Sequence, residues 1–236
     1  MTVPQPTPAE LTALAAFDTP TICNALEVVL PESRAYGYTT RPAVCGFPAL
    51  KPMVGYARTA HVRAKSSPAL SAAEVRSLRH DYYRYVEAGP KPSVVLIQDL
   101  DGADAGYGAF WGEVQSAIHL ALGALGVVTD GSVRDIDQWA PGFQFLAAVI
   151  GPSHAYAHVV DFGGEIEVLG MRVRSGDIVH ADRHGAVIVP VAAIRELPAA
   201  AEKVARREAS ILAVARAPGC TAEKLIAVFK EQDAIH

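Results

Sequence analysis

The stretch GAFWGEVQSAIHLALGALGVVTDGSVRD, residues 108–135, decides the fold. It opens with glycines and Glu113, continues with the apolar spacing of an amphipathic helix, and reaches a short β-type run over 126–129. An Asp-Gly turn then leads into Arg134 and Asp135. Because the helix returns the chain before the strand runs back, the amino end of the helix should meet the carboxyl end of the strand. Open α/β sheets bind their ligands at that edge.

The two ends of this stretch offer complementary chemistry. Asp135 supplies a hard oxygen ligand of the kind that Mg²⁺ or Mn²⁺ prefers, and Glu113 could hold a water of that ion. Arg134 offers a planar fork for a carboxylate or a developing enolate. Free amides at a helix start suit an anion, so the predicted substrate-binding residues are Arg134 with Gly112, Glu113, Val114 and Gln115. This combination suggests chemistry on a 2-oxo acid.

The spacing of these residues carries a family resemblance. The letters WGE at 111–113, 20 further residues and RD at 134–135 resemble the motif of the RraA-like family. That family includes class II pyruvate aldolases acting on 4-hydroxy-4-methyl-2-oxoglutarate and 4-carboxy-4-hydroxy-2-oxoadipate. SGDIVHAD at 175–182 and GAVIVP at 185–190 resemble the family's "PGD…AD..GV.VVP" segment. The resemblance covers roughly residues 17–215 and implies a ring-shaped trimer or hexamer with sites between subunits.

The resemblance implies a divalent-metal lyase that forms a pyruvate enolate. Its reaction would be retro-aldol cleavage of a 4-hydroxy-2-oxo acid, decarboxylation of oxaloacetate, or both. Asp135 would ligate Mg²⁺ or Mn²⁺, while Arg134 and Glu113 would be catalytic. A glutamate from a neighbouring subunit's C-terminal helix completes the site in the family, and Glu208 is the best match here. Relatives usually carry Asp where Asn24 aligns, so no catalytic role is assigned to Asn24.

The family also suggests an alternative from another functional class. It includes a protein inhibitor of ribonuclease E, which acts by binding rather than by catalysis. The chain could therefore be a non-catalytic regulator of ribonuclease activity. The intact set of Glu113, Arg134 and Asp135 favours the enzyme.

The rest of the chain predicts a single α/β domain over residues 1–236. It should have a mixed central sheet, a β-rich second layer and C-terminal helices. Capping boxes begin helices at Thr7 and Ser71, and Thr19-Pro20 begins another. The predicted strands cover 53–63, 94–97 and 143–150, with hairpins over 163–190 as the second layer. Prolines and glycines over 31–52 predict loops and short edge strands. A long helix, with Leu212 facing inward, is predicted over 191–217, and a last amphipathic helix follows it.

Composition excludes several classes of function. The net charge is −4 with no block of like charge, so neither nucleic acid nor an anionic membrane is an expected partner. Three cysteines without a CxxC spacing favour buried free thiols in a reducing cytoplasm. The amino terminus lacks the pattern of a signal peptide, and no apolar run is long enough to span a membrane. A cytoplasmic protein is therefore expected.

Other candidate motifs have simpler explanations. Gly106, Gly108 and Gly112 do not have the spacing of a dinucleotide-binding turn. The histidines at 154, 158, 180 and 184 match no zinc pattern. Asp99, Asp101 and Asp130 are interpreted as turn residues. The far end of the substrate is expected to meet the loops at 31–52 and 64–70.

Overall fold

The computed structural model describes residues 4–233, so the predicted domain limits of 1–236 extend beyond the described residues at both ends. The helices are α1 (Pro8–Leu14), α2 (Thr19–Val29), α3 (Ala72–Ala88), α4 (Glu113–Ala121), α5 (Leu197–Ala215) and α6 (Ala222–Asp233). Short 3₁₀ turns are η1 (Pro31–Ala35), η2 (Gly102–Asp104) and η3 (Ile136–Gln138). The strands are β1 (Val44–Cys45), β2 (Met53–Arg63), β3 (Ser93–Asp99), β4 (Ala109–Trp111), β5 (Ala124–Val133), β6 (Gln144–Ile150), β7 (His158–Phe162), β8 (Glu165–Val168), β9 (Met171–Arg174), β10 (Ile178–Asp182) and β11 (Gly185–Val189).

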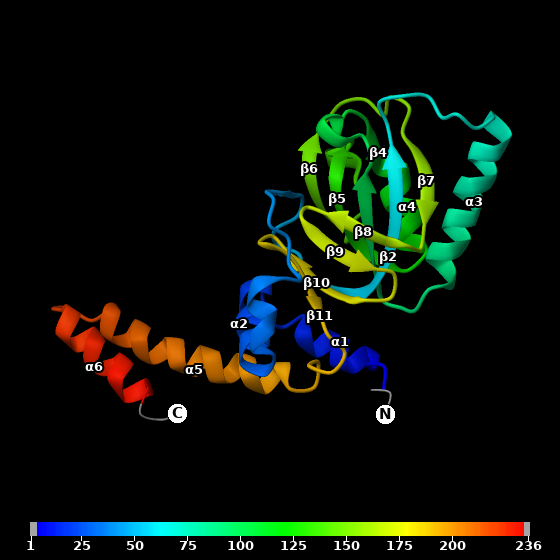
Figure 1. The fold of residues 1–236 in the computed structure, drawn as a ribbon. Coiled ribbons are helices and arrows are strands. Elements are labelled where there is room, and N and C mark those ends of the chain that lie inside the picture. Colours follow the sequence, from blue (N-terminus) through cyan, green and yellow to red (C-terminus); the bar gives the residue numbers. More distant parts are fainter. Residues whose placement is uncertain (1–3, 234–236) are drawn as a thin grey trace.

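A nine-stranded mixed sheet forms the centre of the fold, in the order β1-β6-β5-β3-β2-β10-β11 (Figure 1). Strands β2, β3, β5 and β6 are parallel, so their carboxyl ends lie at one edge. Strand β4 pairs in parallel with the end of β5, and β7 pairs with β2. The predicted mixed central sheet and C-terminal helices are confirmed.

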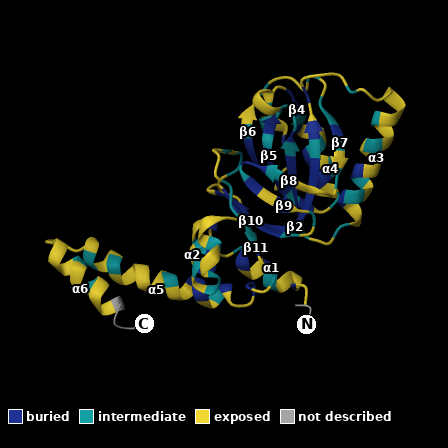
Figure 2. Ribbon diagram, in the orientation of Figure 1, coloured by how far each residue is buried: buried dark blue, intermediate teal, exposed yellow. Residues whose placement is uncertain are grey.

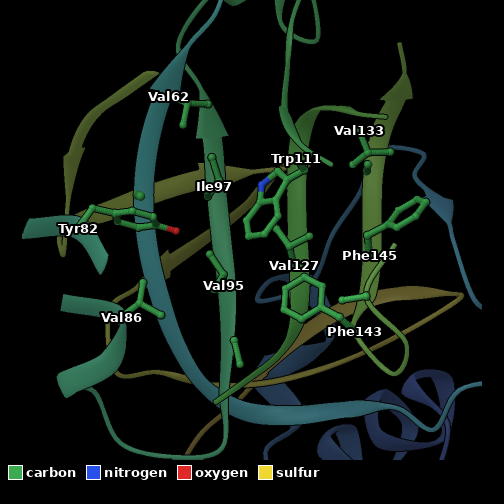
Figure 3. Packing of buried hydrophobic residues seen from close by; sticks show 14 of the residues in the cluster. Val62, Tyr82, Val86, Val95, Ile97, Trp111, Val127, Val133, Phe143 and Phe145 are labelled. Atoms are coloured by element: carbon green, nitrogen blue, oxygen red, sulfur yellow. The ribbon is translucent and has the colours of Figure 1, made fainter. Parts of the chain in front are cut away.

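The two faces of the sheet are covered differently. Helices α3 and α4 cover one face, where Tyr82, Trp111, Val127 and Phe143 belong to one buried cluster (Figure 3). The β8–β9 hairpin covers the other face through buried side chains such as Ile166 and Val173. Helices α1 and α2 and the start of α5 pack on β10 and β11. A ligand site at the carboxyl edge can therefore open on either of two faces.

The predicted β-rich second layer is smaller than expected. Only β8 and β9 form a separate sheet, whereas β10 pairs antiparallel with β2 and β11 with β10. Most of the segment 163–190 thus either extends the main sheet or lies in turns. Backbone pairing with β2 across Ile178–Ala181 decides this, and hydrophobic alternation within the segment does not reveal it.

Local helix signals are confirmed where they depend on neighbouring residues. Thr7 and Glu10 form the capping box of α1, and Ser71 and Glu74 form that of α3. The long C-terminal helix begins at Leu197 instead of residue 191. Its predicted inward residue Leu212 is 40% exposed in the single chain.

Helices α5 and α6 form a hairpin that projects from the body of the molecule (Figure 1). Most of its residues are exposed, as Figure 2 shows. Across residues 4–233, no helix is long and apolar enough to cross a membrane. The three cysteines are free, as predicted, but they are half-buried instead of buried.

Candidate functional site

Strand β4 fixes the two ends of the deciding stretch side by side. Trp111 pairs with Val133 in the parallel β4–β5 ladder. The backbone N–H of Arg134 then donates to the Trp111 carbonyl at 3.0 Å. The start of α4 and the end of β5 are therefore held against each other by backbone hydrogen bonds. This is the meeting of helix start and strand end that the sequence predicts, although it did not predict β4.

Gly112 and the Asp135 side chain lie close together in the site. Asp135 has a left-handed backbone, with φ 55° and ψ 42°, which is uncommon outside glycine. A Cβ atom at Gly112 would lie 2.6 Å from Asp135 Oδ2, so the carboxylate lies directly beside the helix start. The Arg134 guanidinium is near it, with Nη1 3.5 Å from Asp135 Oδ1. Both side chains remain about one-third exposed, which leaves them open to a ligand.

The first turn of α4 has free backbone donors. Gly112 is the N-cap in an extended conformation, and its side-chain position offers no capping group. The first helical hydrogen bond runs from the Ser116 N–H to the Gly112 carbonyl. The preceding amides therefore face outward at the positive end of the helix dipole, where a carboxylate is stabilised.

Buried groups hold this helix start in place. The Ser116 hydroxyl donates to the Glu113 carbonyl at 2.8 Å and accepts from the Ala140 N–H at 3.0 Å. His119 is fully buried, and its Nδ1 lies 2.7 Å from the Gln115 carbonyl, which can only accept. Nε2 of that ring then accepts from the Tyr82 hydroxyl at 2.8 Å. Burial lowers the pKa of His119 to about 4, so the ring is neutral near pH 7.

A cavity of about 300 Å³ lies beside this helix start. Four of the five predicted substrate-binding residues line it, namely Gly112, Val114, Gln115 and Arg134. Glu113 is exposed at the rim of the site, and its carboxylate does not line the cavity. The structure thus places the arginine and the free amides on one cavity, with the Asp135 carboxylate against Gly112.

Zinc and magnesium differ in the number of side-chain ligands that they require from a site. Among residues 4–233, no group of three or more His, Cys, Asp or Glu side chains could hold a metal ion. Zinc sites need such a group. Mg²⁺ keeps several waters and binds through one or two carboxylates with its substrate. A site of that kind needs no more from the protein than one or two open carboxylates, and Asp135 beside Gly112 provides one.

Glu208 lies elsewhere in the same chain. It is on α5, where its Oε1 is 3.4 Å from Asn24 Nδ2 on α2. Helix α5 leaves the body at the end opposite β4, as Figure 1 shows. Glu208 therefore does not join Asp135 within one chain, and a second copy would have to supply it.

The acidic residues Asp99 and Asp130 lie next to each other where β3 ends beside β5. Asp130 lies inside β5 and accepts from the Asp99 N–H at 2.7 Å, so its predicted position in an Asp-Gly turn is wrong. Asp99 does act as a turn residue, accepting from the N–H groups of Asp101 and Gly106. Burial raises the pKa of Asp130 to about 6, and the neighbouring charge of Asp99 adds to the effect. A separate cavity of about 510 Å³ borders the pair.

Comparison with known proteins agrees with this architecture. The fold and the site define an RraA-like α/β protein, with a curled mixed sheet and an arginine–aspartate pair after a central strand. The chain belongs to the RraA-like family, since the family model described as Aldolase/RraA matches residues 19–188. This family includes both lyases and RraA regulators. No protein of curated function matches the sequence.

Several solved structures share the fold. An uncharacterised protein from Pseudomonas syringae pv. tomato has a TM-score of 0.70 at 20% identity, covering 96% of this chain and 97% of that one. A structure described under novel cellulases from gut-associated microbes has a TM-score of 0.69 at 16% identity, covering 89% and 90%. Streptomyces coelicolor RraAS2, described as an unusual member of the RNase ES inhibitor RraA family, has a TM-score of 0.67 at 19% identity, covering 87% and 96%. At these identities the likeness establishes the fold alone.

Proposed function

We propose that the chain is a divalent-metal-dependent lyase that converts a 2-oxo acid into a pyruvate enolate. The observation that carries the proposal is the convergence of Arg134 and the free amides of α4 on one cavity, with Asp135 against Gly112. An anion-binding helix start, a guanidinium and a hard oxygen ligand are the three groups that this chemistry needs.

Each group has a defined task in the reaction. A bound Mg²⁺ or Mn²⁺ would supply Lewis-acid polarisation of the 2-oxo group. The amides at the start of α4 hold the substrate carboxylate. Arg134 donates to the C2 oxygen and stabilises the negative charge that develops there, which is often the largest single contribution to catalysis. Asp135 would hold the metal. The exposed carboxylate of Glu113, which does not line the free cavity, would hold a water that bridges it to the 4-hydroxyl.

The bond changes balance without a redox partner. In the retro-aldol reaction the 4-hydroxyl gives its proton to the water held by Glu113, the C3–C4 bond breaks, and the electron pair of that bond passes into the enolate. A carbonyl product leaves, and C3 then takes up a proton to give pyruvate. Oxaloacetate reaches the same enolate by loss of CO₂. One site can therefore serve aldol cleavage and decarboxylation.

We infer that the complete site includes a second copy of the chain. The α5–α6 hairpin carries Leu212, Ile226 and Phe229 with 40%, 47% and 44% exposure, an apolar surface suited to contact between subunits. Glu208 lies on the same hairpin and could reach the metal site of a neighbour in a trimer or hexamer. Its hydrogen bond with Asn24 would hold it in a fixed position.

The proposal is tested by pyruvate release from oxaloacetate and from 4-hydroxy-4-methyl-2-oxoglutarate. We expect release with Mg²⁺ and its loss after EDTA. Arg134→Ala should remove most activity, and Asp135→Ala should abolish the response to metal. Asp137→Ala is the matched control, because Asp137 is an exposed aspartate two residues further along the chain.

Turnover near the wild-type level in Arg134→Ala would contradict the enolate mechanism. If the wild-type protein releases no pyruvate from either acid, the alternative of a binding regulator comes next. Capture of ribonuclease E by the immobilised protein would then support that alternative.

A further inference from the structure

The cavity beside Arg134 has a second arginine and two histidines in its lining. Arg79 from α3 lines it, together with His154, which precedes β7, and His158, the first residue of β7. Among the residues that the structure describes, no acidic side chain lines this cavity. This contrasts with the whole chain, whose net charge is −4. The two arginines, Arg79 and Arg134, therefore give the cavity a positive lining that is local to it.

These side chains have unused hydrogen-bonding capacity. Within residues 4–233, the Arg79 side chain makes no ion pair or hydrogen bond, so its five N–H donors are available. His154 Nδ1 is 2.7 Å from the Ala155 carbonyl, and His158 Nδ1 is 2.6 Å from the Tyr156 carbonyl. Both rings are thereby oriented, with the Nε2 atoms left without a partner in the described part of the chain.

The roles already assigned to Arg134 and the amides of α4 indicate which part of a ligand Arg79 could bind. Under the proposed function, Arg134 and the amides of α4 bind the 2-oxo acid end of the substrate. A second guanidinium on the same cavity is then left for another negative group. The volume of about 300 Å³ is at the low end for ligand pockets, which favours a small acid over a nucleotide or a peptide.

We propose that Arg79, together with His154 and His158 in the same cavity lining, binds a second anionic group of the substrate. This group lies at the end remote from the 2-oxo acid. The inference rests on the proposed function for the placement of the 2-oxo end. It makes Arg79 a specificity-determining residue that selects 2-oxo dianions over monoanions. The shared chemistry is a carboxylate or a phosphoryl group, either of which a guanidinium binds through two parallel hydrogen bonds. The loops at 31–52 and 64–70, expected to meet this end, contribute no lining residue.

Calorimetric binding of unreactive ligands tests the proposal without turnover. The probes are 2-oxoglutarate, 2-oxopentanoate and 2-oxo-4-phosphonobutanoate, which share the 2-oxo end, and glutarate, which lacks the 2-oxo group. All are titrated with Mg²⁺ present. The variants are Arg79→Gln and the matched control Arg76→Gln, which removes the same charge from an exposed position on the same helix.

We expect the wild-type protein to prefer 2-oxoglutarate over 2-oxopentanoate by about 10-fold or more, the value of one charge-assisted contact. Arg79→Gln should abolish that preference and leave the affinity for 2-oxopentanoate unchanged. Arg76→Gln should keep the preference. Tighter binding of the phosphonate than of 2-oxoglutarate would assign the second group as phosphoryl, and the reverse order as carboxylate.

The possible failures are distinguishable. Equal affinity of the wild-type protein for 2-oxoglutarate and 2-oxopentanoate, or equal effects of the two arginine variants, overturns the assignment of Arg79 and leaves the lyase proposal standing. Binding of glutarate that depends on Arg79, without binding of 2-oxopentanoate, overturns the 2-oxo acid site and retains the anion site. Absence of binding for all four probes overturns both.

Discussion

Substitution of Gly112 by alanine tests the site with a single methyl group. The new Cβ would lie 2.6 Å from Asp135 Oδ2, whereas ordinary contact begins at 3.4 Å, so the carboxylate must withdraw by about 0.8 Å. Misplacement of a reacting group by about 1 Å can cost 10²-fold in rate. We therefore expect kcat/KM for pyruvate release to fall roughly 30- to 100-fold, which equals about 2 to 3 kcal/mol.

The same substitution should leave the fold intact. Gly112 has φ −169°, an extended conformation that alanine also adopts. The free energy of unfolding should accordingly change by less than about 1 kcal/mol, as measured by urea titration. The Mg²⁺ concentration for half-maximal activity should rise as Asp135 moves. Gly164→Ala is the matched control, because no atom lies within 4 Å of its Cβ position.

A folded Gly112→Ala protein with wild-type turnover and an unchanged Mg²⁺ requirement would refute the reasoning. It would show that the carboxylate at Asp135 is not held in the productive position by its contact with Gly112. Loss of activity in Gly164→Ala as well would assign the effect to a general loss of glycine flexibility.

Two further predictions concern pH. Burial lowers the pKa of His119 from its ordinary value of 6.5 to about 4. The contribution of the neutral ring to the free energy of unfolding is therefore complete above about pH 6.5. This contribution falls by up to roughly 3 kcal/mol as the pH drops toward 4. Urea unfolding at pH 7 and pH 5 should show a smaller decrease for His119→Gln than for the wild type, and equal decreases would contradict a buried neutral ring. The pKa of Asp130 is raised from 3.8 to about 6, so its ionised form destabilises the fold at neutral pH. Asp130→Asn keeps an oxygen that can accept from the Asp99 N–H. The substitution should raise the free energy of unfolding at pH 7 by up to roughly 3 kcal/mol, and this gain should vanish below about pH 4. A gain that persists at pH 3 would point to another cause.

The sequence predicts those parts of the structure that depend on near neighbours. The capping boxes at Thr7 and Ser71 are local signals, and both begin helices where expected. The apolar run over 94–97 is fully buried in β3, because a strand covered on both faces requires apolar residues throughout. The stretch 108–135 has its two ends together, since a helix followed by a parallel strand returns the chain to the same edge.

What the sequence could not predict depends on distant segments. Asp130-Gly131 has the composition of a turn, yet β5 continues through it because neighbouring segments bind its groups, as in the Asp99 hydrogen bond. Strand β4 is only three residues long and exists through its pairing with β5. Arg79 and His158 are 79 positions apart, so no local pattern joins them to one cavity.

The pairing of Trp111 with Val133 fixes the number of residues that can lie between the two ends of the motif. Helix α4 and strand β5 form a closed path between these two residues, and the pairing fixes where the path ends. One residue inserted within β5 would turn every later side chain of the strand to the other face of the sheet. Val133 would then leave the buried cluster of Trp111 and Phe143 for the other face of the sheet, and Arg134 would lose its backbone hydrogen bond to Trp111. The interval of 20 residues between Glu113 and Arg134 is thus a structural length, and point changes within it should be tolerated far better than a single insertion or deletion.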